Sequence, residues 1–293
     1  MKRAKQPAGS HHKRKSQAKE IWRRMKRNRL AMVGLVMIIM LLLMAIFADV
    51  LADEDLALSR SPDRLQGPSA AHWFGTDNLG RDVFARIVHG SRISLTLGIA
   101  TTALSLIIGG LIGAISGYFG GIVDNIIMRV ADMFMAIPSI LLTLAMVAAL
   151  GTSITNLIIA TTISNVPGFV RIIRSYILTV IGQEYIEAAK ACGMGDFMII
   201  LRHILPNVIG PIVVEATMTV AGMILSISGL SYLGMGVQPP TPEWGAMLSE
   251  ANDHMIKYPH LVIFPGLFIV LSALSLNLLG DGLRDAIDPR LKD

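Results

Sequence analysis

Polar side chains inside an apolar stretch are the first candidates for a functional site in this sequence. The stretch 208–236 is mainly apolar but contains Glu215, Ser226 and Ser228. Polar groups at membrane depth line transport pathways or pair across helices, because a lone charge in hydrocarbon is costly. These three residues are therefore candidates to line a translocation path, where the Glu215 carboxylate could meet a substrate amine. Glu215 follows Pro206 by only nine positions. We therefore favour the alternative, a carboxylate near the membrane face that is paired or reaches water.

A second acid, Asp132, lies near the start of the apolar stretch 130–150. We expect it to be buried against Arg129 or a neighbouring subunit rather than to line a path. Enzymatic chemistry has little support, since the sequence contains no H-E-x-x-H and residues 229–234 miss G-x-S-x-G by one position. An intramembrane enzyme would have to rely on Asp132, Glu215 and seven scattered histidines. We therefore predict no catalytic residue and no metal site.

The composition is that of a membrane protein. Hydrophobic residues make up 53% of the 293 positions and charged residues only 16%, which is too apolar for a soluble domain of this size. The net charge of +5 arises at the N-terminus, because residues 1–30 hold 12 of the 26 Lys and Arg. This basic arm predicts a topology signal that touches anionic lipid, not a nucleic-acid site. Residues 1–15 are predicted to be disordered, and apolar residues recurring over 21–30 predict an amphipathic helix on the inner membrane face.

Six apolar stretches predict six membrane-spanning helices and an all-α membrane protein, because about 20 residues cross the hydrocarbon core. The expected spans cover residues 31–48, 93–119, 130–150, 156–170, 208–236 and 261–279. We expect a tight turn at 120–125, a kink at Pro138, and a fourth span interrupted by Asn165 and Pro167. Glycines spaced by four in the second span predict close helix packing.

The charge distribution orients these spans. The basic arm places the N-terminus in the cytoplasm, and six crossings return the C-terminus to the same side. The expected organisation is a basic cytoplasmic arm with an amphipathic helix (1–30), a first transmembrane helix (31–50), an extracytoplasmic loop (51–92), a five-helix core (93–280) and a cytoplasmic tail (281–293). The polar stretch 184–207, between the fourth and fifth spans, then lies inside the cell.

That polar stretch predicts a helix, a turn and a second helix. Small alanines give the first helix, 184–192, a compact face that a partner can approach closely. Gly193 and Gly195 break it, because glycine supplies the backbone freedom that a sharp turn needs. Asp196 is placed to cap the second helix, 197–204, and a proline two residues later ends that helix or begins the next span.

The same stretch resembles the EAA loop of ABC importer permeases. His203 stands where that pattern has Ile, a departure of one position, since Ile204 follows. The positions that match the spacing of the motif are Glu187, Ala188, Ala189, Gly193, Leu205 and Pro206. The resemblance implies a type I permease fold and a coupling helix that docks into a groove on a cytoplasmic ATPase subunit.

Residues 75–92 and the C-terminal part, including 239–245 and 277–293, resemble the C-type subunits of the dipeptide, oligopeptide and nickel branch of this family. The likeness runs from about residue 22 to 292. It implies a permease that forms half of the pathway for di- or oligopeptides in the cell membrane. The implied partners are a homologous B-type permease, two ATPase subunits and an extracytoplasmic substrate-binding protein.

Two alternatives to a peptide importer stay open at this point. Within the family, the substrate could be nickel or a nickel chelate. Outside it, a self-contained secondary transporter would show internal repeats, and the sequence has no convincing repeat. The chain has no G-x-x-x-x-G-K-[ST] loop for ATP phosphates. The resemblance accordingly implies that ATP and Mg²⁺ are bound by the partner subunits and that this chain needs no cofactor.

Overall fold

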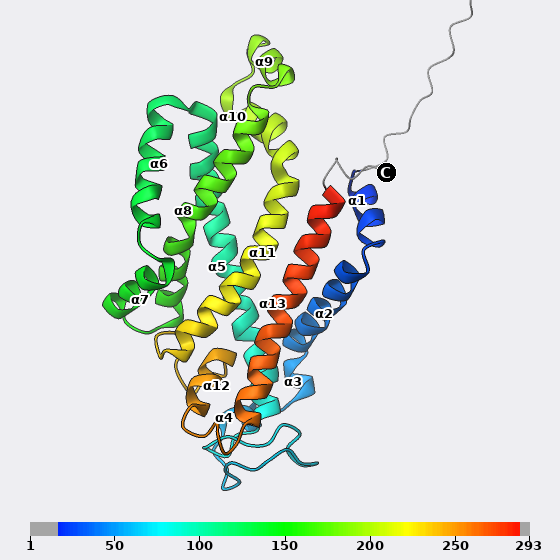
Figure 1. Cartoon of the computed structure of the whole chain (residues 1–293), viewed down its shortest axis with the longest axis vertical. Helices are drawn as coiled ribbons and strands as arrows, with labels where there is room; N and C mark the ends of the chain where they lie inside the picture. Colours follow the sequence, from blue (N-terminus) through cyan, green and yellow to red (C-terminus); the bar gives the residue numbers. More distant parts are fainter. Residues whose placement is uncertain (1–16, 288–293) are drawn as a thin grey trace, which may run out of the picture.

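A computed structural model of the chain describes residues 17–287, and the predicted disorder of 1–15 and the end of the predicted tail lie outside them. In this part every regular element is a helix, apart from one isolated bridge between Thr76 and Asp82 (Figure 1). The elements are α1 (Gln17–Met25), α2 (Arg29–Ile46), α3 (Ala48–Leu51), α4 (Glu54–Leu58), α5 (Val83–Phe119), α6 (Gly121–Met135), α7 (Ser139–Leu150), α8 (Ile154–Val180), α9 (Glu184–Ala191), α10 (Asp196–Ile199), a π-helical turn (Ile200–Ile204), α11 (Leu205–Tyr232), α12 (Trp244–Ala251) and α13 (His260–Ile287).

Five of the described helices are long and apolar enough to cross a membrane, and a bent pair brings the number to six if it counts as one span. The bent pair is α6 and α7, whose axes differ by 81°. Pro138 lies at this break, directly before α7. A proline lacks the N–H that a continuing helix needs. The all-α fold with five to six spans is confirmed, but the predicted third span is a broken helix and not one kinked rod.

Several helices are longer than the hydropathy pattern predicted. The second span begins at Val83 instead of residue 93, because the Asp82 carboxylate accepts the Ala85 N–H at 2.8 Å and caps the helix there. The fourth runs through Pro167 to Val180 without interruption. The sixth continues into the predicted tail and ends at Ile287. The expected turn 120–125 is wrong as well, since α6 begins at Gly121.

Close packing of α5 against α8 forms the centre of the bundle. A Cβ added to Gly113 would lie 2.6 Å from the Val170 carbonyl oxygen, and one added to Gly109 would lie 2.6 Å from the Phe169 Cβ. Real side chains do not approach so closely, so these glycines let the two backbones touch. On the other side, α13 packs between α2 and α11. This confirms the packing role predicted for the glycine row.

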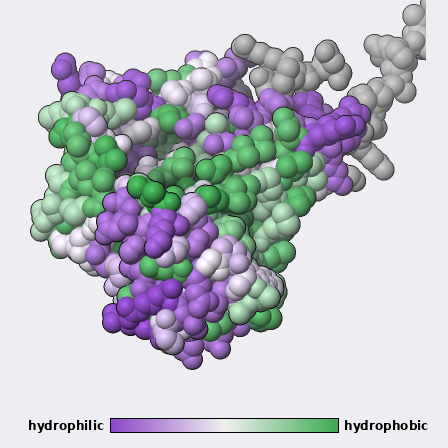
Figure 2. Space-filling model, turned by 60° about the horizontal axis from the view of Figure 1, so that its bottom comes forward, coloured by the Kyte–Doolittle hydropathy of each residue, from purple (hydrophilic) through white to green (hydrophobic). Residues whose placement is uncertain are grey.

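The helix bundle has a polar region at each of its two ends. Figure 1 shows α1, α9 and the C-terminal end of α13 at one end, with α3, α4 and α12 at the other. Figure 2 brings the second end forward and shows hydrophilic residues over it, with hydrophobic residues on the flanks behind. α9 therefore shares an end with the basic helix α1, as the expected topology requires.

Candidate functional site

The helix α9 and the turn after it form a hairpin that projects from one end of the bundle (Figure 1). Gly193 takes a φ of +76°, which L-residues with a side chain rarely adopt. Its N–H donates to the Lys190 carbonyl at 2.9 Å, and the Met194 N–H donates to the Ala189 carbonyl at 3.1 Å. These two bonds are the Schellman pattern that closes a helix C-terminus. Gly195 has a φ of −67°, so the turn depends on Gly193 alone.

One face of α9 anchors the hairpin to the bundle. Ile186 is fully buried and Ala189 nearly so, in a cluster that includes Ile177 of α8 and Ile204. Glu187, on the other face, is exposed. The expected coupling residues therefore divide between an outward face, with Glu187, Ala188 and Gly193, and an anchor, Ala189.

Leu205 and Pro206, the last two motif positions, lie in the first turn of α11 and are exposed. The sequence suggested that the second helix of the hairpin could end at this proline, but the helix continues through it. Instead α10, the π-helical turn and α11 form one rod of 37 residues, Asp196–Tyr232. In the π-helical turn the Leu205 N–H donates to the Ile200 carbonyl. The wider turn makes room for the proline ring, which would clash with the carbonyl four residues back.

The hairpin is also tied to α5 by a contact that the sequence did not reveal. The Tyr118 hydroxyl donates to the Asp196 carboxylate at 2.6 Å, and the Lys190 ammonium lies 5.1 Å from the Tyr118 ring centroid. Asp196 was expected to cap the second helix, which is wrong, because Gly195 holds the cap position and no side-chain cap bond forms. The Asp196 carboxylate instead lies in the first turn, where a negative charge also favours the helix dipole.

The three candidate path residues do not come together, since they are spread along α11. Ser228 is buried, and its hydroxyl donates to the Glu243 carboxylate at 3.4 Å. Glu243 is fully buried, accepts from Ser94 at 2.9 Å and caps α12 through the Ala246 N–H. Ser228 thus belongs to the joint between α11, α12 and α5, and this burial argues against the path-lining role expected for it.

The other two candidates have different surroundings. Glu215 is half-buried on α11, in the neighbourhood of Tyr176 of α8 and Arg284 of α13. The path-lining role of Glu215 and its alternative, a paired or water-reaching carboxylate near the membrane face, both stay predictions. Ser226 is exposed and lines a cavity of about 50 Å³ between α7, α8 and α11. The sequence could not reveal this cavity, because its walls come from three separate segments.

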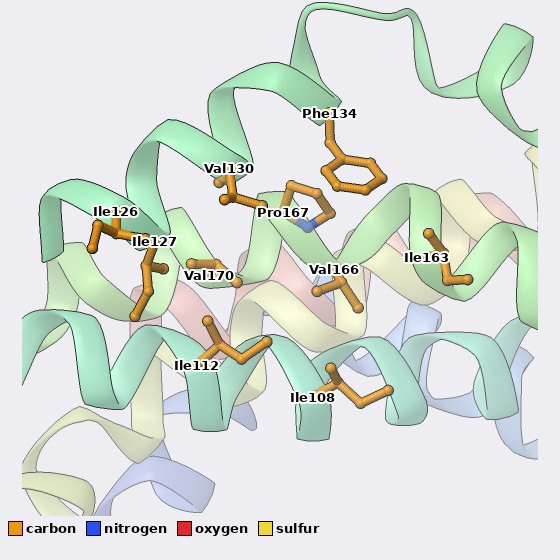
Figure 3. A pocket seen from close by; sticks show the side chains of 11 residues that line it. Ile108, Ile112, Ile126, Ile127, Val130, Phe134, Ile163, Val166, Pro167 and Val170 are labelled. Carbon is orange, nitrogen blue, oxygen red and sulfur yellow. The ribbon is translucent and has the colours of Figure 1, made fainter. Parts of the chain in front are cut away.

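Two ion pairs hold α6 against α8. Asp132 pairs with Arg171 of α8, whereas the sequence suggested burial against Arg129 or a neighbouring subunit. Both side chains of the pair are about half exposed. Arg174 Nη2 lies 2.6 Å from the Asp124 carboxylate, which is largely buried. An apolar groove of about 340 Å³ runs beside these pairs between α5, α6 and α8. Figure 3 shows that Pro167 lies among the lining side chains, so it forms part of the groove wall and does not interrupt α8.

At the opposite end, four charged side chains form a nearly buried network. Arg81 Nε lies 2.6 Å from the Asp77 carboxylate, and Arg81 Nη2 lies 2.8 Å from Glu250. Arg86 Nη1 contacts the same two carboxylates. The two cations and two carboxylates balance, as buried charges require. This network gives the segment 75–92 a structural role, because it joins the long loop to α12.

No group of three or more His, Cys, Asp or Glu side chains in the described residues is arranged to hold a metal ion. The fold and this geometry can be compared with known proteins. Residues 109–293 match the family model of the binding-protein-dependent transport system inner membrane component, and residues 16–68 match the N-terminal TM domain of oligopeptide transport permease C.

Curated relatives match over nearly the whole chain. The dipeptide transport system permease protein DppC of Alkalihalophilus pseudofirmus is 47% identical over 94% of this chain and 90% of its own length. The glutathione transport system permease protein GsiD of Pectobacterium atrosepticum is 45% identical over 94% of this chain and 91% of its own. Among solved structures, an inward-facing form of the MetNI methionine ABC transporter aligns with a TM-score of 0.58 at 19% identity, over 69% of this chain and 97% of that one. This last likeness concerns the fold alone.

Proposed function

Because the chain belongs to the family of binding-protein-dependent transport system inner membrane components, we propose that it forms half of the translocation pathway of an ATP-driven importer of di- or oligopeptides. The chain is a multi-pass membrane protein and a permease subunit of an ABC importer. Permease subunits of this family are not catalytic, and their ATPase is a separate subunit. Transport through this chain therefore requires a mechanical link between the permease and the separate ATPase subunit.

The observation that carries the proposal is the projecting hairpin and its rigid continuation into a span. Glu187 and Ala188 are exposed on α9, and the next helix runs without a break from Asp196 to Tyr232. A displacement imposed on α9 would therefore move α11 as a body, since a continuous helix is stiffer than a loop. In the proposed cycle an ATPase subunit holds α9. Closure of the ATPase pair then moves α8 and α11, so that the translocation pathway opens to the other side of the membrane.

The partners follow from this assignment. Two cytoplasmic ATPase subunits, which bind ATP and Mg²⁺, face the end with α1 and α9, and one of them takes this hairpin. A homologous B-type permease completes the pathway. A substrate-binding protein meets the opposite end, where the nearly buried network of Arg81 and Glu250 joins the long loop to α12. This orientation places both termini in the cytoplasm.

Peptides are the favoured cargo because the relatives DppC and GsiD are named for dipeptide and glutathione transport. Both of these cargoes contain peptide bonds. A nickel chelate is the alternative, and uptake assays separate the two. The complex, with the binding protein encoded beside it, should accumulate a labelled dipeptide and not a nickel chelate. The reverse result would replace the proposed cargo.

Crosslinking tests the coupling. Cys192 is the chain's single cysteine, so a Cys192→Ser chain with Ala188→Cys carries one thiol on the hairpin. We expect that thiol to crosslink to a nucleotide-binding subunit in the assembled complex. The matched control, Asp253→Cys, places an exposed thiol after α12 at the opposite end and should give no such product. Equal crosslinking from both positions, or none from Ala188→Cys, would contradict the proposal.

A further inference from the structure

The cavity beside Ser226 has an unusual lining for membrane depth. It lies between α7, α8 and α11, has a volume of about 50 Å³, and is larger than one water needs. Every residue that lines it in the described part of the chain is uncharged. Its polar lining consists of Ser139, Thr143, Thr161, Ser164, Asn165 and Ser226, and its apolar lining of Ile140, Met223 and Leu230.

The hydroxyl protons of the wall are largely engaged with the protein itself. Thr143 Oγ1 lies 2.9 Å from the Ser139 carbonyl and 2.8 Å from Ser164 Oγ, which donates in turn to the Ala160 carbonyl at 2.9 Å. Thr161 donates to the Leu157 carbonyl at 2.6 Å. A hydroxyl that donates in this way keeps lone pairs that can accept. The wall therefore retains capacity to accept a hydrogen bond.

Asn165 supplies the complementary group. Its side-chain Nδ2 is buried, and among the described residues it has no hydrogen-bond partner. A buried amide donor without a partner is unfavourable. Asn165 lines the cavity, and a turn of its side-chain amide about the soft terminal torsion brings this donor to an acceptor there. On α11, the exposed Ser226 hydroxyl can donate or accept. The cavity thus offers donors and acceptors at once, without a charge.

We propose that this cavity binds the backbone amide group of a peptide in transit, with Asn165 donating to the peptide carbonyl and Ser226 accepting from the peptide N–H. A peptide group has one donor and one acceptor flanked by carbon atoms, which fits this polar and apolar lining. An uncharged lining does not favour metal ions or the charged termini, because nothing there compensates their desolvation. Recognition of the backbone alone is independent of side chains. This inference rests on the proposed function, uptake of peptides.

The test compares an amide with an ester at one position of the cargo. The reconstituted complex takes up alanine tripeptide or the analogue in which the second peptide bond is an ester, each delivered by saturating loaded binding protein. The ester lacks the N–H and is a weaker acceptor. The binding protein's own preference cancels when the amide-to-ester ratio of uptake rates is compared between wild type and variant.

Asn165→Leu keeps the side-chain volume and removes the amide, and Ser226→Ala removes the hydroxyl. We expect each to lower the amide-to-ester ratio by about 3- to 10-fold, the effect of one hydrogen bond. The matched controls are Ser175→Ala on α8 and Thr217→Val on α11, whose hydroxyls bond within their own helices at 2.7 and 2.8 Å. These controls should keep the wild-type ratio.

The outcomes separate the two proposals. If the wild-type complex takes up neither compound, the peptide function itself fails. If the wild type transports and both variants keep its ratio, the cavity does not bind the peptide group and the inference is overturned. Loss of the partner permease from the purified complex in both variants would make the cavity a subunit contact, which also overturns it. If only the Asn165→Leu variant fails to assemble, the amide-to-ester ratio of the Ser226→Ala variant alone tests the inference.

Discussion

The Tyr118 hydroxyl at the end of α5 donates a hydrogen bond of 2.6 Å to the Asp196 carboxylate at the start of α10. The two residues are 78 positions apart in the sequence. Their bond joins the glycine-packed helix pair of the bundle centre to the rod that continues into α11. The hairpin of α9 therefore lies between two fixed points, the buried Ile186 on its inner face and this bond at its base.

Tyr118→Phe tests that anchor. Removing the hydroxyl should destabilise the docked hairpin by about 1 kcal/mol, a value below that of a buried charged hydrogen bond because Asp196 is exposed. Amide hydrogen exchange over residues 184–199 should then rise roughly fivefold. Tyr185→Phe, at an exposed position on α9, is the control and should leave exchange unchanged. Equal exchange in the two variants would mean that the bond does not hold the hairpin.

Gly193→Ala and Gly195→Ala form a matched pair. A Cβ at either position meets no atom within 4 Å, but only Gly193 has a positive φ. The alanine at 193 should therefore cost about 1–2 kcal/mol of backbone strain and open the turn, whereas the alanine at 195 should be tolerated. Peptide-stimulated ATP hydrolysis by the assembled complex is the measurement. A loss in the Gly195→Ala variant equal to that in Gly193→Ala would show that glycine conformation is not the cause.

Gly113→Ala tests the contact between α5 and α8. The added methyl would lie 2.6 Å from the Val170 carbonyl oxygen, whereas a methyl at Gly110, on the same helix, meets nothing within 4 Å. Overpacking should destabilise Gly113→Ala by about 1–3 kcal/mol. The thermal midpoint of the detergent-purified complex should fall for this variant and stay level or rise for Gly110→Ala. A fall of the same size in both would point to a lipid or partner contact at Gly110.

Glu250→Gln tests the charged network at the opposite end. The variant leaves Arg81 and Arg86 with one carboxylate, Asp77, although both arginines are almost fully buried. Removing one partner of a buried ion pair is strongly destabilising, and we expect about 3 kcal/mol. Asp253→Asn, which removes an exposed carboxylate after α12, should change little. Thermal unfolding measures the stability of both variants. An unchanged unfolding midpoint for Glu250→Gln would mean that the network is open to water.

The class of the protein could be inferred from the sequence alone. The apolar stretches are longer than a soluble helix needs, and lipid leaves the backbone no partner but its own helix, so all-α architecture and the approximate spans followed from hydropathy. The motif spacing from Glu187 to Pro206 and the positive φ at Gly193 are local properties, which is why the hairpin could be predicted.

Which polar groups meet could not be inferred in this way and became clear from the folded structure. Arg86 and Glu250 are 164 positions apart, and Ser94 and Glu243 are 149 apart, so no local pattern could predict the buried network or the burial of Ser228. The 81° bend after α6 brings Thr143 against Ser164 and thereby forms the cavity. Hydropathy reports whether a segment prefers lipid to water. The partner of each polar side chain depends on how the helices pack, which is a property of the whole chain.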